Sequence, residues 1–358
     1  MTENNISSPT RRTALAAGLG SLALLAACGE RGRFFALPSA GPVFRGLTMG
    51  SSYTVKLASR GLADATLAAA EPAVAAALAD VVGSLSHYDP ASEVSRLNRH
   101  PVGAPFAVSP ATLQVFAVAQ AVRAASGGAF DVAVGHAIDE WGFGPSEKPR
   151  RVLSASALQA LQRLPHDAAL ALDARAGTLT RRAPVLANLS GIAKGYGVDR
   201  AALALDALGI GDYLIEVGGE IRSKGRNGEG RPWQLAIERP DAMPQRALYI
   251  VPLADKSLAT SGDYRNFFMQ DGRRYSHEID PATAAPVGHA LASVSVVADD
   301  CTRADAWSTA LFVLGPERGF AAAARHGLAA YFVVRHADGS FAERQTAAFA
   351  VLGGRAAA

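Results

Sequence analysis

The chain contains only two cysteines, Cys28 and Cys301, among its 358 residues. With so few thiols, the fold cannot depend on a framework of disulfides, and its stability must come from buried apolar side chains. The chain also has no large excess of charge of either sign, because 35 Lys and Arg residues nearly balance 32 Asp and Glu residues. No block of basic residues with interleaved aromatic residues occurs. We therefore expect no nucleic acid among the partners of this protein.

The apolar run near the start of the chain is short. The uncharged stretch over residues 14–27 is too short to cross a bilayer as a permanent helix. Arg11 and Arg12 precede this stretch, and Cys28 follows small residues directly after it. This pattern predicts an export signal that ends in a bacterial lipobox. The arginine pair favours the twin-arginine route, while an ordinary secretory signal with an incidental arginine pair is the alternative.

The predicted organisation has three parts. Residues 1–28 form the export signal, residues 29–43 form a tether with several Gly, Pro and Arg, and residues 44–358 form the folded domain. Lipidation is predicted at Cys28. We expect the mature protein in the bacterial cell envelope, facing the periplasm and anchored to a membrane by its lipid. A hydrophobic content of 49% is ordinary for a globular domain and excludes a disordered chain.

Apolar residues recur with a period of two in some segments and near 3.6 in others, which predicts a mixed fold of sheets and helices. Helices are predicted over residues 64–82, 110–125, 154–163, 193–208, 302–314 and 317–326. Strands are predicted over residues 53–57, 170–172, 185–189, 213–217, 233–238, 248–253, 292–298 and 329–334. Ser109 is the expected N-cap of the second helix, because Pro110 suits the first helical position.

Two oxygen ligands stand one turn apart on the helix predicted over residues 302–314. Asp305 and Thr309 are separated by four positions, so they share a helix face and can point at one small cation. A carboxylate and a neutral hydroxyl form an incomplete shell that Mg²⁺ accepts when phosphate and water supply the other ligands. The alternative is structural: Asp305 caps the helix, and Thr309 bonds back within it.

A glycine-rich turn over residues 188–199 places Lys194 in the first turn of a predicted helix. A lysine there opposes the helix dipole, so a bound phosphate or carboxylate explains it better than a solvated surface position, which is the alternative. The turn matches neither the Walker loop nor the Rossmann fingerprint. Thr260, Ser261 and Gly262 follow an apolar run and could direct donors at phosphate oxygens, although such a segment is also a common turn.

Two more segments interrupt the regular pattern. Gly218 and Gly219 end an apolar strand before an acid, which we interpret as a strand with a bulge. His277 and Asp280 lie in one extended stretch that Pro281 closes. Side chains three residues apart on a strand diverge, so this histidine and this aspartate are not expected to form a pair.

Together these segments resemble the ApbE-like flavin transferases, the family of FAD:protein FMN transferases. The matching segments follow the family's order over about residues 45–315, and they are Met49–Tyr53, Ser86–Pro90, Ser92–Asn98, Gly128–Val132, Trp141–Gly144, Ile192–Asp199, Gly218–Gly219, Thr260–Tyr264, Ser276–Pro281 and Ala304–Ala310. Each segment is short and unspecific by itself. Their common order makes the resemblance specific.

The resemblance implies an α+β fold with mostly antiparallel sheets flanked by helices and a ligand cleft between subdomains. It also implies an enzyme that uses Mg²⁺, takes FAD as its substrate and cleaves the FAD pyrophosphate. FMN would pass to a threonine or serine hydroxyl of a partner flavoprotein, and AMP would leave. Such a transfer depends mainly on positioning and charge stabilisation, which a cation, a lysine and donor-rich loops can supply.

Carried over by position, the resemblance implies His277 as the catalytic residue. It implies Asp305 and Thr309 as metal ligands, together with a backbone carbonyl in the turn at Gly191. The implied FAD site is lined by Met49, Tyr88, Ala129, Phe130, Asp131, Asn188, Lys194, Thr260, Ser261, Gly262 and Ile279.

Two positions depart from the family pattern. Asn188 stands where the family usually has an aspartate, and Ala285 stands where a glycine that can adopt positive φ is common. Two alternative functions therefore stay open at this point. One is hydrolysis of FAD to FMN and AMP in the same site, and the other is a lipoprotein that binds or delivers FAD without chemistry.

Overall fold

The computed structural model describes residues 41–58, 61–166, 169–241 and 244–357. The predicted export signal, the lipidation site Cys28 and residues 29–40 of the predicted tether lie outside these described residues. β1 (Val43–Thr48) begins at the last residue of that tether.

An eight-stranded sheet organises the domain, with the strand order β1-β2-β6-β7-β10-β15-β16-β17. Every pairing between these strands is antiparallel. The strands after β1 are β2 (Ser51–Leu57), β6 (Tyr213–Val217), β7 (Glu220–Lys224), β10 (Lys256–Gly262), β15 (Leu291–Ala298), β16 (Ala329–Arg335) and β17 (Phe341–Gln345). The predicted mixed fold with mostly antiparallel sheets is confirmed.

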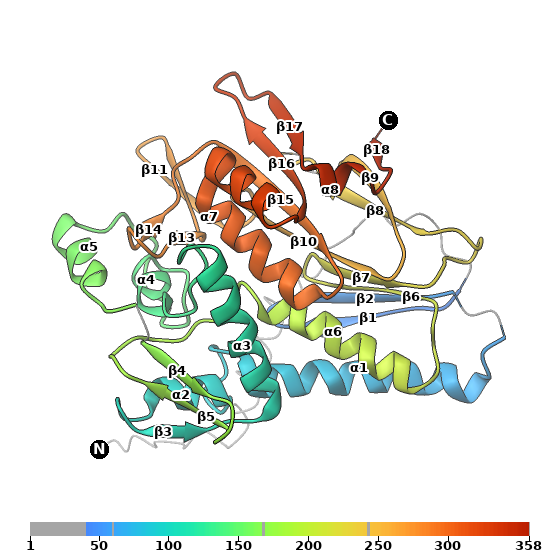
Figure 1. Cartoon of the computed structure of the whole chain (residues 1–358), viewed down its shortest axis with the longest axis horizontal. Coiled ribbons are helices and arrows are strands. Elements are labelled where there is room, and N and C mark those ends of the chain that lie inside the picture. The colour runs from blue at the N-terminus through green and yellow to red at the C-terminus, as the bar shows by residue number, and fades with distance from the viewer. Residues whose placement is uncertain (1–40, 59–60, 167–168, 242–243, 358) are drawn as a thin grey trace, which may run out of the picture. The chain divides into compact units, whose positions relative to one another are not determined.

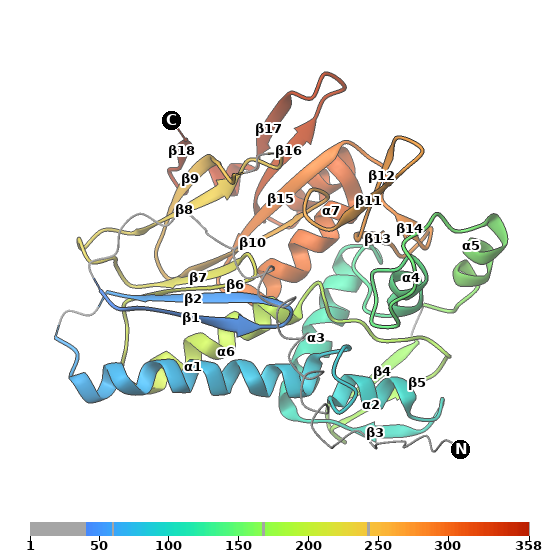
Figure 2. The same cartoon turned by 180° about the vertical axis from the view of Figure 1, so that it is seen from behind.

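Helices cover one face of this sheet. Figures 1 and 2 show α1 (Asp64–Leu85) lying alongside α6 (Ala193–Ala207), with α7 (Cys301–Arg325) against β10 and β15. α6 packs against both other helices. A three-stranded sheet packs on the opposite face and consists of β8 (Trp233–Glu238), β9 (Ala247–Leu253) and β18 (Arg355–Ala356).

Side chains of β16 show why the sheet is covered on both faces. Ala330 and Phe332 belong to the apolar cluster on the helical side, whereas Tyr331 and Val333 belong to the cluster beside β8 and β9. Successive residues of a strand point to opposite faces, so a strand that is apolar at every position is buried on both sides.

The other described elements are shorter or lie outside the central sheet. The helices are α2 (Glu93–Arg99), α3 (Pro110–Ala125), α4 (Gly135–Glu140), α5 (Ala155–Gln162) and α8 (Ala347–Ala350). The strands are β3 (Pro105–Ala107), β4 (Leu170–Asp173), β5 (Thr178–Arg181), β11 (Phe267–Gln270), β12 (Arg273–Ser276), β13 (Ile279–Asp280) and β14 (Ala285–Pro286).

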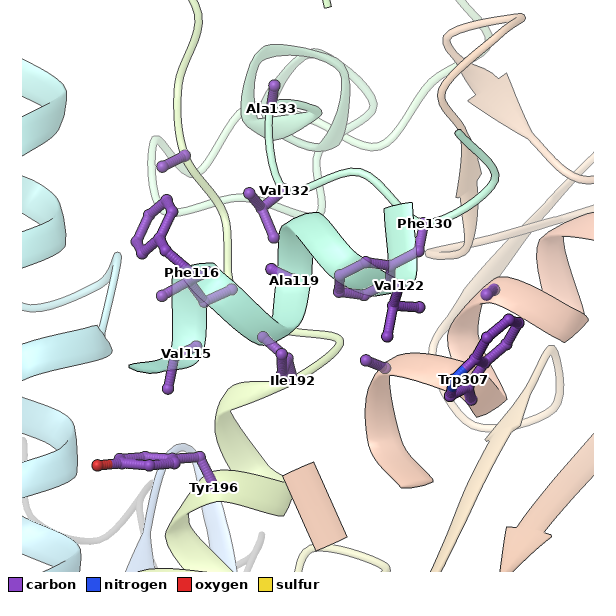
Figure 3. Close-up of a cluster of buried hydrophobic side chains, with 14 of the residues drawn as sticks. Val115, Phe116, Ala119, Val122, Phe130, Val132, Ala133, Ile192, Tyr196 and Trp307 are labelled. Atoms are coloured by element: carbon purple, nitrogen blue, oxygen red, sulfur yellow. The ribbon is translucent and has the colours of Figure 1, made fainter. Parts of the chain in front are cut away.

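One apolar cluster connects α3 and the loop after it to α6 and α7. Figure 3 shows Val122 of α3 beside Phe130, with Ile192 at the start of α6 and Trp307 on α7 in the same cluster. Phe130 and Ile192 are 3% and 0% exposed, so the segments that carry them are fixed by core packing rather than by loop contacts alone. Both segments also border the candidate site described below.

α6 and α7 approach each other closely at Gly195, where a Cβ atom would lie 2.7 Å from Cβ of Asp305. We expect Gly195→Ala to lower the free energy of unfolding by about 1–3 kcal/mol, because the added methyl group overpacks this contact. Gly83 in α1 is the control, since a Cβ atom there meets nothing within 4 Å. Gly83→Ala should raise stability by roughly 0.5–1 kcal/mol. Urea unfolding measures both free energies of unfolding. A change in the same direction in both variants would contradict the expectation.

The structure corrects one predicted strand. Residues 185–189 form no strand, and only Leu186 makes a single bridge, to Val134. The backbone of Ala187 instead forms both of its hydrogen bonds with the side-chain amide of Asn98, at 2.7 and 2.9 Å. The apolar run of this segment therefore reflects burial of an extended loop, whose backbone bonds to a side chain and to the loop at residues 132–135 rather than to a strand.

Other predictions hold closely. α3 has the predicted bounds, and its N-cap Ser109 accepts a hydrogen bond from the backbone of Thr112. The two helices predicted over residues 302–314 and 317–326 form α7, which is interrupted at Gly315 with a positive φ of 81°. A positive φ is incompatible with a right-handed helix, so the helix is interrupted at Gly315. Glycine adopts this backbone conformation without strain.

Candidate active site

A cavity of about 300 Å³ is bordered by the loop after α3, the start of α6, the β6–β7 turn, the end of β10 and the segment after β12. Most of the predicted site residues border this cavity, and they are Ala129, Phe130, Asp131, Asn188, Gly191, Lys194, Thr260, Ser261, Gly262, His277, Ile279, Asp305 and Thr309. Segments far apart in the sequence thus meet in one place.

Met49 and Tyr88 do not border the cavity. Met49 occupies the β1–β2 turn with a positive φ of 49°, and its terminal methyl group lies against Gly197 of α6. Tyr88 is 61% exposed, and its hydroxyl donates to the carbonyl of Phe143 at 3.1 Å. Their implied contact with FAD stays a prediction.

Asp305 and Thr309 both border the cavity from α7. The Asp305 side chain is buried, and its Oδ2 accepts a hydrogen bond from the backbone N–H of Gly195 at 2.8 Å. Gly191 lies close to Thr309, because a Cβ atom on this glycine would be 2.8 Å from Oγ1 of the threonine. The hydroxyl of Thr309 therefore lies beside the backbone of Gly191, and the carboxylate of Asp305 borders the same cavity.

The structural alternative for Asp305 and Thr309, a helix cap and a bond back within the helix, does not agree with the contacts of α7. Asp300, not Asp305, is the N-cap of α7, and it accepts a hydrogen bond from the backbone of Arg303 at 2.8 Å. Thr309 Oγ1 lies 3.2 Å from the hydroxyl of Ser261 on β10, and no bond back into its own helix occurs among the described residues.

The donor set suits a hard cation. Its groups are all oxygens, as Mg²⁺ prefers, and the shell is incomplete, as Mg²⁺ tolerates when phosphate and water supply other ligands. Within the described ranges, no group of three His, Cys, Asp or Glu side chains is arranged to bind a metal. The mixed set of Asp305, Thr309 and Gly191 therefore fits the predicted ion, and a site made only of side-chain acids and imidazoles does not occur there.

Lys194 has a carboxylate partner within the chain. Its Nζ donates to Oε1 of Glu220 at 2.6 Å, and Glu220 is buried at the start of β7. The turn before Glu220 is a two-residue hairpin in which Gly218 and Gly219 both have positive φ, 57° and 114°, and Val217 pairs with Glu220. The predicted bulge was therefore wrong. Two consecutive glycines between apolar runs are typical of such hairpins.

Acidic groups outnumber basic ones around this lysine. Burial raises the pKa of Glu216 to about 7 and the pKa values of Glu220 and Glu278 to about 8, and it also raises the pKa of Asp305. Burial opposes the charge of Lys194, but the carboxylates of Glu220 and Asp305 raise its pKa overall. The carboxyls of Glu220, Glu278 and Asp305 border the cavity together with Lys194, and a cation bound there would favour their ionised forms.

His277 directly follows β12 and borders the cavity. Its Nδ1 lies 3.2 Å from the carbonyl oxygen of Asn266. A carbonyl only accepts, so Nδ1 carries the proton and Nε2 keeps a free lone pair. Burial, aided by the charge of Lys194, lowers the pKa of His277 to about 4. The imidazole is therefore neutral at physiological pH and able to accept a proton.

The acid beside His277 is Glu278, whose Oε1 lies 3.8 Å from Nε2. Asp280 instead accepts a hydrogen bond from the backbone of Ala282 at 2.9 Å. The expectation that His277 and Asp280 do not form a pair is confirmed.

Comparison with known proteins identifies the family of this chain. The model of the ApbE family matches residues 49–332. The chain belongs to the ApbE family.

Relatives of this ApbE protein match it over nearly their whole length. The FAD:protein FMN transferase of Haemophilus influenzae is 38% identical over 333 residues, which are 92% of this chain and 94% of the relative. The flavin transferase ApbE from Vibrio cholerae superposes with a TM-score of 0.79 at 38% identity, over 88% of this chain and 99% of that structure. Pseudomonas stutzeri flavinyl transferase ApbE, in its apo form, gives 0.79 at 39% identity, over 88% and 98%.

Several residues that border the cavity of this ApbE protein were not predicted as site residues. They are Val134, Ile138, Ser190, Gly218, Gly219, Glu220, Tyr264, Arg265, Asn266, Glu278 and Pro281. Tyr264 and Arg265 both contact the buried carboxylate of Glu238. These two residues lie two and three positions after Gly262, the last residue of the predicted segment, and Glu278 directly follows His277. Closeness in the sequence to a predicted site residue was thus the signal that could have identified these three residues.

The two departures from the family pattern have different outcomes. Asn188 is buried and uses Oδ1 to accept a hydrogen bond from the backbone of Ser190 at 2.9 Å, so its amide nitrogen is the group that it can offer a ligand. Ala285 pairs with Asp280 in β14, and the positive φ of 54° occurs at Ala284 instead. The expected strain at Ala285 was therefore placed one residue too late.

Proposed function

We propose that this chain is a Mg²⁺-dependent FAD:protein FMN transferase. It cleaves the pyrophosphate of FAD, transfers FMN to a threonine or serine hydroxyl of a partner flavoprotein and releases AMP. The observation that carries the proposal is the convergence of Asp305 and Thr309, Lys194 and the free Nε2 of His277 on one cavity. The activity named for the relatives supports the same reaction.

Each part of the site has a task in this reaction. The hydroxyl oxygen of the acceptor bonds to the phosphorus of the FMN half, the P–O bond to the AMP phosphate breaks, and Nε2 of His277 takes the hydroxyl proton. Asp305, Thr309 and the backbone of Gly191 would hold Mg²⁺, which when bound neutralises phosphate oxygens. Lys194 adds a second positive charge beside them.

Mass spectrometry tests the reaction directly. The mature domain is incubated with FAD, Mg²⁺ and candidate acceptor flavoproteins, and acceptor peptides are searched for an FMN adduct. Transfer predicts this adduct together with AMP. Release of FMN and AMP without an adduct would identify FAD hydrolysis instead. Bound FAD with no AMP released would identify a protein that binds or delivers the flavin.

We also propose that the protein acts in the cell envelope, exported by the signal over residues 1–28 and anchored through a lipid on Cys28. The small residues before this cysteine support that location. We expect Cys28→Ser to move the protein from the membrane fraction to the soluble fraction of lysed cells, measured by immunoblot. Cys301→Ser is the control, because Cys301 is completely buried in the domain. An unchanged membrane fraction for Cys28→Ser would contradict the anchor.

A further inference from the structure

Glu278 has no task in the proposed reaction, yet it is the acid beside the proton-accepting nitrogen of His277. Its carboxyl borders the cavity, and Oε1 lies 3.8 Å from Nε2 of the imidazole. The residue is only 9% exposed. In the part of the chain that the structure describes, no group donates a hydrogen bond to this carboxyl. The carboxyl is open to the cavity and is not used by a contact that stabilises the fold, so it is available to the site.

The backbone around Glu278 holds this carboxyl in place. Its N–H lies 3.4 Å from the hydroxyl of Ser276, and its carbonyl accepts a hydrogen bond from the N–H of Val287 at 3.0 Å. Asp280, two residues later, shows the contrast, because its carboxylate accepts a backbone hydrogen bond that stabilises a turn. The carboxyl of Glu278 thus faces the cavity from a fixed main chain, while that of Asp280 serves the local turn.

Transfer creates a positive charge on the ring of His277, which the charge of Asp263 favours and a carboxyl beside the ring can stabilise further. When Nε2 takes the hydroxyl proton, the ring becomes a cation at the edge of the cavity, with 36% of the His277 side chain exposed. Lys194 disfavours this cation, since its charge already lowers the pKa of His277. On the Nδ1 side the ring contacts the carbonyl of Asn266, which is neutral. Glu278 is the carboxylate beside the ring, and the positive charge formed on His277 would in turn favour its ionised form.

We propose that Glu278 is a positioning residue for His277 that orients the ring and stabilises the imidazolium formed during FMN transfer. The inference rests on the proposed function. Glu278 forms and breaks no covalent bond in this step. The proton moves from the acceptor hydroxyl to Nε2, the new O–P bond forms at the FMN phosphorus, and the electron pair of the broken P–O bond leaves with AMP.

The test compares Glu278→Gln with the wild-type enzyme in single-turnover transfer from FAD to the acceptor that the wild-type enzyme modifies. We expect the rate to fall roughly 10- to 100-fold, a modest share of the effect of a general base. The Kd values for FAD and Mg²⁺ should stay within about threefold, because the variant keeps the shape of the side chain. Glu278→Asp should regain part of the rate, and Asp280→Asn, the control, should keep the wild-type rate.

A double variant decides whether Glu278 acts through His277. In the His277→Ala background, Glu278→Gln should slow transfer no further, since the group that it assists is gone. Three results would overturn the proposal: a wild-type rate for Glu278→Gln, an equal slowing in both backgrounds, or full recovery of the rate at high Mg²⁺. Wild-type enzyme that forms no FMN adduct would instead overturn the proposed function, before any variant is compared.

Discussion

The Asp305→Ala variant is expected to lose about 10³-fold or more in FMN transfer and to lose its response to Mg²⁺. The loss corresponds to several kcal/mol of transition-state stabilisation, the amount that a bound cation supplies to a transferring phosphoryl group. Only a hydroxyl and a backbone group would remain in the proposed donor set. Isothermal titration with Mg²⁺ measures the binding part of this prediction, and the transfer rate over a Mg²⁺ series measures the catalytic part.

A second variant separates the metal site from the fold. Asp305 also accepts a hydrogen bond from the N–H of Gly195, so the alanine variant leaves a buried donor unpaired. Asp305→Asn keeps an acceptor for this donor and removes only the charge, and it should still fail to bind Mg²⁺ tightly. Asp300→Asn is the control, because asparagine is an equally good N-cap. Equal Mg²⁺ affinity in Asp305→Asn and in wild-type enzyme would reject the metal assignment.

His277→Ala should retain FAD binding and lose roughly 10²- to 10⁴-fold in transfer, the range expected for a positioned general base. Burial keeps the imidazole neutral, with a pKa of about 4, so Nε2 is ready to accept a proton at physiological pH. Flavin fluorescence titration measures binding, and single-turnover formation of the covalent adduct measures transfer.

The control for the histidine variant is His336→Ala. His336 is exposed in the turn between β16 and β17 and does not border the cavity. It should keep the wild-type rate. Near-normal turnover of His277→Ala would refute the catalytic assignment, whereas a large loss of FAD affinity in this variant would make the histidine a binding residue instead.

Helices with local end signals could be predicted closely. The bounds of α3 follow from the N-cap Ser109, from Pro110 at the first position and from the glycines after residue 125. Residues 185–189 could not be predicted in the same way. Their apolar residues are typical of a buried strand, but the backbone of Ala187 pairs with the side-chain amide of Asn98, which is 89 positions away in the sequence. No local pattern encodes such a partner.

Single residues of the candidate site could be predicted from the sequence, but the partners that they contact could not. The sequence placed Lys194 near an anion, and the structure identifies one partner as the carboxylate of Glu220 across the β6–β7 turn. The family resemblance marked His277, but the acid beside its ring is Glu278, which was not predicted as a site residue. An acid directly next to a histidine on an extended segment should diverge from it, and a local departure from ideal strand geometry brings these two together.

By itself, the sequence determined that Asp305 and Thr309 share one face of a helix, because the helical period depends only on backbone hydrogen bonds between near neighbours. Tertiary structure alone decided that this face meets Gly191, Lys194 and His277 around one cavity. These residues belong to segments that core packing and strand pairing bring together. Such long-range contacts form only when the whole chain buries its apolar surface, so no local pattern specifies them.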